Sequence, residues 1–200
     1  MRFLVWMLSH TVYRVSHKGL DQIPSEGGAL IACNHVSYVD ALVLAGAVSR
    51  PIRFIMLKSI YELPVLNFVF RTCSTVPITS KTTDPEAYEA AFSEIRAGLE
   101  AGDLLCIFPE GALTKDGEIA PFRKGIERIV EETPVPVVPM ALQGLWKSFF
   151  SHRKGVFNPT KLPGGIFSKV TVSAGAPVAP SAVTAEGLQV AVSALRGDQR

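Results

Sequence analysis

The arrangement of apolar runs from Gly28 onward restricts the fold most, because short runs alternate there with stretches of helical periodicity. Strands are predicted at 28–33, 52–57, 74–78, 103–108, 135–142 and 168–173, and helices at 38–48, 63–71, 84–101 and 122–132. This alternation predicts an α/β domain with a largely parallel central sheet flanked by helices. Pro136 and Pro139 favour an edge or bulged position for the strand that contains them.

The helix predicted at 84–101 carries the clearest signals of the set. Asp84 can cap its first turn, and Pro85 suits the first helical position. The positions expected to face the core are Tyr88, Ala91, Phe92, Ile95 and Leu99. A chain of 200 residues with 48% hydrophobic residues can bury such a face within one domain.

Residues 1–20 predict an amphipathic helix that precedes an α/β domain at 21–200. Apolar side chains that include Trp6 stand beside Arg2, Arg14 and Lys18, and no acidic residue precedes Asp21. Such a helix either lies at a membrane interface or packs on its own domain. No apolar run reaches the ~18 residues of a membrane-spanning helix. The expected attachment is therefore peripheral.

A second basic region extends from Thr133 to Ala185, where neither Asp nor Glu occurs. Lysines and arginines alternate there with Trp146 and several phenylalanines. This mixture suits an anionic lipid surface, and a solvated basic loop is the alternative. A net charge of only +2 argues against a nucleic-acid partner.

The cysteines bear on the compartment of the protein. Three scattered cysteines (33, 73 and 106) predict buried free thiols rather than a disulfide framework or a metal site. A reducing compartment together with membrane attachment predicts the cytoplasmic face of a membrane.

His35 and Asp40 form the first candidate site. A histidine held by a carboxylate can take a proton from a hydroxyl group. Positions five apart lie ~140° around a helix, so we expect His35 in the turn after a strand and Asp40 in the first turn of a helix. The same residues can be interpreted as a helix start, with Ser37 as the cap.

Two further clusters follow predicted elements. Glu110, Gly111 and Thr114 come directly after the strand at 103–108, where they suit either hydroxyl binding or an ordinary turn. Arg123 and Lys124 open a predicted helix, where a basic pair suits either a phosphate or solvent.

The ordered blocks NHVSYVD, FPEGALT, PFRKG and VPVVPM resemble the PlsC-type glycerolipid acyltransferases over about residues 20–145. The resemblance implies that His35 is a general base assisted by Asp40. It implies that Glu110, Gly111 and Thr114 bind the glycerol head group and that Arg123 lies near its phosphate. The implied donor is acyl-CoA or acyl carrier protein, and no cofactor is required.

One block departs from the family pattern. Glycerol-phosphate and lysophosphatidate acyltransferases usually carry an arginine after a short strand, used for phosphate, and this chain has none in the stretch from Cys73 to Lys81. Lys81 can substitute for it, and Arg71 lies just before. In this block the chain resembles the acyltransferase domains of bifunctional or transporter-fused proteins that act on lysophospholipids.

The expected reaction is transfer of a fatty acyl group to the free hydroxyl of a lysophospholipid at the membrane surface. Asn34 or backbone N–H groups of the turn are expected to stabilise the oxyanion. Ser37, Lys81 and Lys124 complete the expected substrate-binding set. Two other functions remain open, a thioester or ester hydrolase with the same pair and a non-catalytic lipid-binding module.

Overall fold

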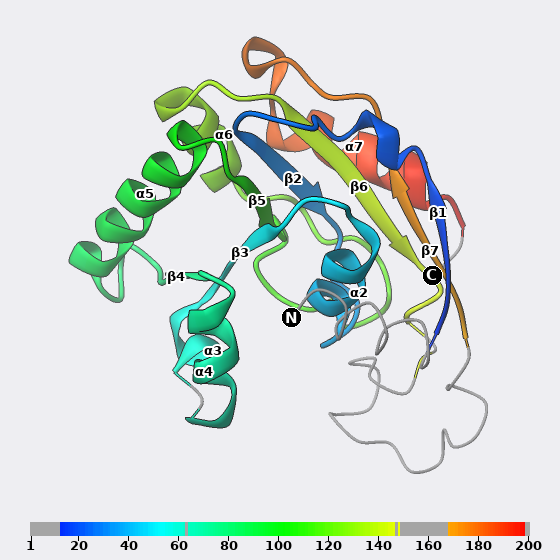
Figure 1. Ribbon diagram of the computed structural model, residues 1–200, viewed down its shortest axis with the longest axis horizontal. Helices are drawn as coiled ribbons and strands as arrows, with labels where there is room; N and C mark the ends of the chain where they lie inside the picture. Colours follow the sequence, from blue (N-terminus) through cyan, green and yellow to red (C-terminus); the bar gives the residue numbers. More distant parts are fainter. Residues whose placement is uncertain (1–12, 63, 147, 149–167, 199–200) are drawn as a thin grey trace.

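The protein folds around one seven-stranded sheet (Figure 1). The computed structural model describes residues 13–62, 64–146, 148 and 168–198. The strands are β1 (Arg14–Lys18), β2 (Ala29–Cys33), β3 (Ile52–Leu57), β4 (Val76–Ile78), β5 (Leu104–Ile107), β6 (Val137–Gln143) and β7 (Lys169–Ala174). Their order is β1-β7-β6-β2-β5-β3-β4, and only the β6–β7 pair is antiparallel. The predicted largely parallel sheet is confirmed.

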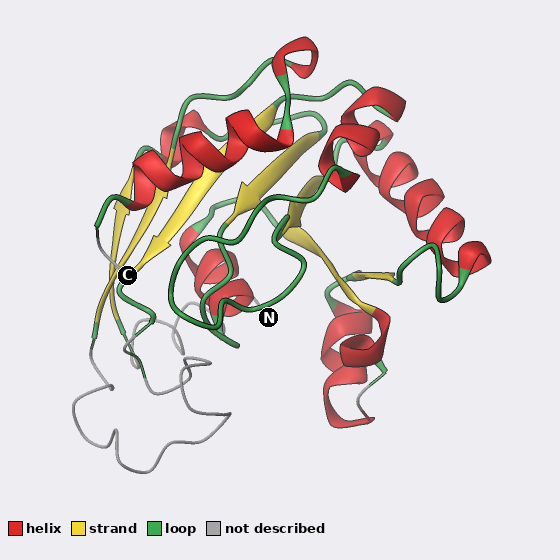
Figure 2. Cartoon of the chain, turned by 180° about the vertical axis from the view of Figure 1, so that it is seen from behind, coloured by secondary structure: helices red, strands yellow, loops and turns green. Residues whose placement is uncertain are grey.

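Helices cover both faces of this sheet (Figure 2). The α-helices are α2 (Asp40–Ala47), α3 (Lys58–Tyr61), α4 (Pro64–Thr72), α5 (Pro85–Glu100), α6 (Gly125–Glu132) and α7 (Ala185–Arg196), with short 3-10 turns at Leu20–Gln22 and Pro180–Ala182. Leu30 and Ala32 of β2 face a core built with α5, α6 and α7, whereas Ile31 and Cys33 face a second core with α2. The whole of β2 is buried, as a central parallel strand requires.

The prediction for α5 is confirmed in detail. The Asp84 side chain accepts a hydrogen bond from the N–H of Ala87, and Pro85 occupies the first turn. Phe92, Ile95 and Leu99 are buried on one face, as their spacing predicts. Local signals were sufficient because cap, first turn and apolar stripe all lie within one segment.

The edge position predicted from Pro136 and Pro139 is wrong, because β6 lies between β2 and β7. The Pro139 carbonyl accepts a hydrogen bond from the N–H of Gly175, just past the end of β7. A strand residue directs its N–H and C=O to the same side, so the missing donor of Pro139 also faces that end. No hydrogen bond between β6 and β2 is lost, so this central strand tolerates the proline.

The N-terminal helix predicted for residues 1–20 is wrong where the structure describes it. Residues 14–18 form β1, which pairs in parallel with β7, and Leu20–Gln22 form a 3-10 turn. Tyr13 is buried in the core on the α2 side of the sheet. The partner strand lies about 155 residues away, so no local pattern marks β1. Residues 1–12 lie outside the described part of the chain.

Helix α7 was not predicted, although its sequence carries a readable signal. Thr184 caps it by accepting a hydrogen bond from the N–H of Gly187. Ala185, Leu188 and Val192 are buried at helical spacing. All three cysteines are free, and Cys73 is exposed rather than buried as predicted.

Candidate active site

His35 and Asp40 meet at the carboxyl end of β2. His35 lies in the turn after this strand, and Asp40 is the first residue of α2 (Figure 1). The Nδ1 atom of His35 lies 2.8 Å from Oδ2 of Asp40. The layout predicted from their spacing is confirmed, at the edge where open α/β sheets bind ligands.

Asp40 also fixes the backbone of the turn. Its Oδ2 accepts hydrogen bonds from the N–H groups of Val36 (2.7 Å) and Ser37 (2.9 Å), and the residue is fully buried. Val39, rather than Ser37 as predicted, stands at the cap position of α2. The bond from the Ser37 N–H to Asp40 still follows the predicted pattern, and the Ser37 hydroxyl accepts from the N–H of Val39 (3.4 Å). Ser37 is buried as well, and its role in substrate binding stays a prediction.

The imidazole of His35 is held on its face as well as at Nδ1. The ring of Phe108 stacks on it with centroids 4.2 Å apart and an angle of 16°. Phe108 directly follows β5, which pairs with β2, so the sheet places the two rings together. The Nδ1–H donates to Asp40, and Nε2 makes no hydrogen bond to any described residue. Because 24% of the His35 side chain is exposed, its free nitrogen can accept a proton from a bound hydroxyl.

Sequence reasoning did not assign a role to Phe108. The available signal was an aromatic residue at the last position of the strand predicted at 103–108. A stacked ring restricts the imidazole to one plane and excludes water from one of its faces.

Glu110 links the His35 turn to the loop that follows β5. Its Oε1 accepts from the N–H of His35 (2.7 Å), and its Oε2 accepts from the N–H of Ala120 (2.8 Å). Burial raises the pKa of Glu110 above its ordinary value, and the two backbone N–H bonds oppose this shift. Both oxygens are engaged with the chain itself. The observed contacts therefore favour a scaffolding role over the predicted contact with a head-group hydroxyl.

Thr114 is engaged in the same loop. Its N–H donates to the carbonyl of His35 (3.0 Å), and its hydroxyl donates to the carbonyl of Glu118 (2.7 Å). The hydroxyl also accepts from the N–H of Gly117 (3.0 Å). Thr114 is buried, so its contacts too hold the loop against the His35 turn.

Gly111 and Arg123 lie in direct contact. A Cβ atom built on Gly111 would lie 2.6 Å from Cζ of Arg123, and the glycine has a φ of 71°. The close approach predicted for a ligand at Gly111 is thus made by the Arg123 side chain. Arg123 and Lys124 are exposed, and neither forms an ion pair with another described residue. Helix α6 begins at Gly125, just after this basic pair.

Lys81 lies farther from the pair than these residues. It is exposed in the turn after β4, and β3 and β5 separate β4 from β2. At ~4.8 Å per strand, that offset is about 14 Å across the sheet. The strand order therefore does not place Lys81 beside His35.

Asn34 is fully buried and bonds to β6 through both atoms of its amide. Its Oδ1 accepts from the N–H of Leu142 (2.8 Å), and its Nδ2 donates to the Leu142 carbonyl (3.1 Å). The N–H groups of His35, Val36 and Ser37 already donate to carboxylates. The oxyanion donors predicted at this turn are therefore engaged elsewhere in the structure.

A buried phenol lies behind the pair, and nothing in the sequence indicated it. Burial is the main cause that raises the pKa of Tyr13, the nearby Ser148 side chain lowers it, and the negative charge of Asp40 raises it. The Oδ1 atom of Asp40 is buried without a hydrogen-bond partner among the described residues. The inner side of the Asp40 carboxylate is thus shielded from solvent.

Comparison with known proteins adds family information to this geometry. A family model described as "Acyltransferase" matches residues 14–143. The 1-acyl-sn-glycerol-3-phosphate acyltransferase BAT2, chloroplastic, of Brassica napus is 30% identical over 147 residues, which cover 73% of this chain and 42% of that protein. The 1-acyl-sn-glycerol-3-phosphate acyltransferase of Bacillus subtilis is 25% identical over 125 residues, which cover 62% and 60% of the two chains.

A solved structure shows the same fold. The crystal structure of the 1-acyl-sn-glycerophosphate acyltransferase PlsC from Thermotoga maritima superposes with a TM-score of 0.74 at 22% identity, covering 96% of this chain and 75% of that one. This chain spans about 42% of the Brassica relative and 60% of the Bacillus relative. Because the family model covers the His35–Asp40 turn, the Glu110 loop and β6 together, the chain belongs to the PlsC-type acyltransferase family.

Proposed function

We propose that this protein transfers a fatty acyl group from an acyl thioester to the free hydroxyl of a lysophospholipid. The observation that carries the proposal is the His35–Asp40 pair, with Nδ1 bonded to the carboxylate at 2.8 Å and Nε2 open. Family membership supports acyl transfer as the reaction. The names of the similar proteins from Brassica and Bacillus favour a 1-acylglycerol-3-phosphate as acceptor.

The chemistry follows from the open nitrogen. Nε2 of His35 removes the proton of the acceptor hydroxyl while its oxygen attacks the thioester carbonyl carbon. The tetrahedral intermediate then collapses, the C–S bond breaks, and the imidazolium returns the proton to the departing sulfur. The products are a diacyl phospholipid and a free thiol. Asp40 keeps the tautomer with its proton on Nδ1 and stabilises the imidazolium that forms.

The substrates follow from the same proposal. The exposed cations of Arg123 and Lys124 supply a site for the acceptor phosphate, at the loop that Glu110 joins to His35. The donor is acyl-CoA or acyl carrier protein, and no cofactor takes part. The proposed place of action is the cytoplasmic face of a membrane. Among the residues that the structure describes, no helix is long and apolar enough to cross a bilayer.

The test is an acceptor screen with a fixed acyl donor, in which thiol release and product mass are followed together. His35→Ala should reduce acceptor-dependent thiol release by about 10²–10⁴-fold, the usual contribution of a general base, with an unchanged melting temperature. His17→Ala is the matched control, because His17 lies exposed on β1 at the far edge of the sheet.

Near-normal thiol release by folded His35→Ala protein would overturn the mechanism. Accumulation of free fatty acid instead of diacyl lipid would identify a hydrolase. Lipid binding by the wild type without any thiol release would identify a non-catalytic module.

A further inference from the structure

Two helices, α3 and α4, protrude where β3 ends. They connect β3 to β4 and stand apart from the helices that cover the sheet, beyond the edge where β2 and β6 end (Figures 1 and 2). His35 lies at this same edge, directly after β2. We call the segment from Lys58 to Thr72 the α3–α4 hairpin. Whatever contacts its outer surface also lies on the side of the molecule that carries the catalytic pair.

The hairpin has an inner and an outer face. On the inner face the rings of Tyr61 and Phe70 stack with centroids 6.3 Å apart, and the Asn67 amide donates to the Tyr61 carbonyl (2.8 Å). Phe68 precedes Phe70 by two positions, about 200° around the helix, and is 74% exposed. Because Phe70 already packs on the inner face, Phe68 points away from it and stays exposed to solvent.

Exposed apolar side chains gather at this end of the molecule. The described residues include five exposed large hydrophobic side chains, and four of them follow or end a strand at the carboxyl edge: Tyr38, Leu57, Ile60 and Phe68. Val190 on α7 is the fifth. Exposed large apolar side chains that are grouped at one edge, rather than scattered singly, are typical of an interaction surface.

The hairpin contains three charged residues, Lys58, Glu62 and Arg71. Lys58 pairs with Asp84. Arg71 forms no ion pair with any described residue. Its cation therefore remains available to an external anion.

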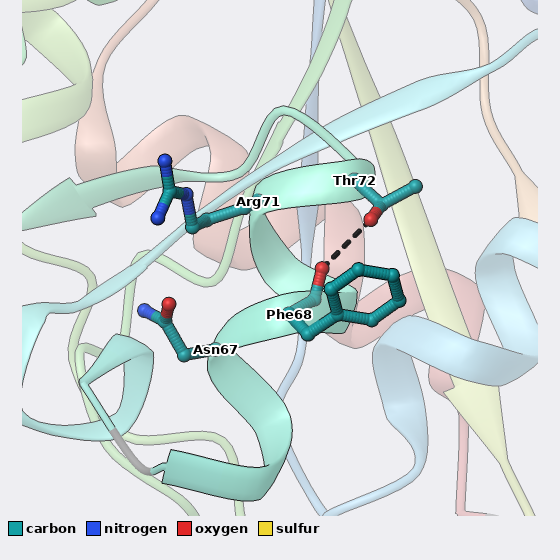
Figure 3. Close-up of a pocket in the computed structure, with 4 residues that line it drawn as sticks. All are labelled: Asn67, Phe68, Arg71 and Thr72. Atoms are coloured by element: carbon teal, nitrogen blue, oxygen red, sulfur yellow. Dashed lines mark hydrogen bonds between the residues drawn. The ribbon is translucent and has the colours of Figure 1, made fainter.

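Arg71 and Phe68 line one open pocket on α4, together with Asn67 and Thr72 (Figure 3). The Thr72 hydroxyl is bonded to the Phe68 carbonyl (2.7 Å), so it stays within the helix. Asn67 and Arg71 extend from one side of α4, and the Phe68 ring extends from another. The Arg71 cation and the Phe68 ring are three positions apart on one helix, which suits a phosphate group at the boundary of an apolar layer.

We propose that the outer face of the α3–α4 hairpin docks on an anionic phospholipid bilayer, with Phe68 in the acyl boundary and Arg71 at a lipid phosphate. The choice of a bilayer over another apolar partner rests on the proposed function, because the acceptor is a membrane lipid. Docking there turns the carboxyl edge of the sheet, and so His35, toward the bilayer.

The experiment measures binding of the full chain to sedimented vesicles of phosphatidylcholine, with and without phosphatidylglycerol. Phe68→Ser should weaken binding to both vesicle types by about tenfold, since a phenyl ring leaves the acyl boundary. Arg71→Gln should weaken binding by about fivefold, on the anionic vesicles only. Val190→Ser is the matched control, because Val190 is 70% exposed on a different helix, and it should bind as the wild type does.

Wild-type binding by folded Phe68→Ser protein would overturn the proposal, as would an equal loss in Val190→Ser. A loss of self-association in Phe68→Ser, seen by sedimentation velocity without lipid, would assign the face to a second copy of the chain. Acyl transfer to a detergent-dispersed acceptor should stay unchanged in Phe68→Ser while transfer on vesicles falls. If the wild type releases no thiol in either assay, the proposed function fails, and the vesicle binding data still decide the docking face.

Discussion

Two carboxylates hold the His35 turn from opposite sides. Asp40 bonds to the imidazole and to the N–H groups of Val36 and Ser37, while Glu110 bonds to the N–H of His35 itself. Three consecutive backbone donors and one ring donor are therefore matched to two acidic side chains. A turn with these four donors engaged has few alternative conformations, so the imidazole keeps its orientation for proton transfer.

Glu110 gives this turn a pH dependence. Its folded-state pKa is raised above the ordinary 4.5, mainly by burial. For a raised pKa, the contribution to the free energy of unfolding is fully present below about pH 4.5 and is lost as the pH rises through the folded-state value. Glu110→Gln removes this titration. The difference in free energy of unfolding, wild type minus Glu110→Gln, should therefore fall as the pH rises above about 4.5.

Urea denaturation of both proteins across that range checks the trend, with Glu26→Gln at an exposed loop position as the control for buffer effects. A difference that grows with pH would contradict the raised pKa.

Gly111 and Arg123 are coupled by contact. Gly111→Ala places a methyl group 2.6 Å from Cζ of Arg123 and keeps a φ of 71°. We expect a loss of about 1–3 kcal/mol from the backbone conformation, together with a displaced guanidinium. In an Arg123→Ala background the clash disappears and only the conformational part remains. Gly111→Ala should therefore cost less free energy of unfolding there, and a double-mutant cycle measures the difference. Identical costs in both backgrounds would mean that the two side chains do not interact.

At the scale of the elements, Asn34 continues a ladder that its strand has ended. β2 pairs with β6 as far as Cys33 and Met140, and the Asn34 amide then bonds to both backbone groups of Leu142. The Asn34 side chain thus takes the place of a further strand residue in the hydrogen bonding to β6. The turn that carries His35 can leave the sheet while staying anchored to β6.

Asn34→Ala should lower the free energy of unfolding by about 2–4 kcal/mol, because the buried N–H and C=O of Leu142 lose their partners. Asn34→Asp is expected to be worse near pH 7, since a carboxylate faces the Leu142 carbonyl. Chemical denaturation and steady-state kinetics on the same samples separate two roles. An Asn34→Ala protein with normal stability and a large loss in kcat would point instead to direct stabilisation of the oxyanion.

Elements were predictable where their signals are local. For α5, the cap at Asp84, the proline at the first turn and the buried face all lie within the helix, and its prediction held. β1 is different, because a five-residue edge strand with one partner has no reason to be extended until β7 is present. The edge position predicted from Pro139 was wrong for a related reason. A central strand tolerates this proline because of where β7 ends, about 35 residues later.

At the scale of the whole molecule, the first strand closes one edge of the sheet. β1 pairs with β7 along its outer edge, and Tyr13, directly before β1, is buried beside α2. A deletion that ends at residue 12 leaves both in place, whereas a deletion through residue 20 removes them. The second deletion exposes the edge of β7 and opens the core.

The deletion through residue 20 should therefore lower stability by at least about 2 kcal/mol, from the lost burial of Tyr13 alone, and promote aggregation. The shorter deletion keeps β1 and Tyr13, so it should be more stable than the longer one, and it is the variant with which to test membrane binding by residues 1–12. Thermal unfolding and analytical sedimentation of the two deletions check this. Equal stability of both would show that β1 contributes nothing to the fold.

The sequence by itself determined the α/β class, most helices and strands, and the pairing of His35 with Asp40. These depend on periodicity and on a spacing of five residues, which act over one or two turns of chain. Only the tertiary structure decided which polar groups are already bonded to one another. The bond from His35 to Glu110 spans 75 residues, and the bond from Asn34 to Leu142 spans 108. Such partners are brought together by the strand order β6-β2-β5, which no local pattern encodes. For that reason the predicted substrate ligands Glu110, Thr114 and Asn34 are found bonded to the chain itself, while Arg123 and Lys124 remain open to solvent.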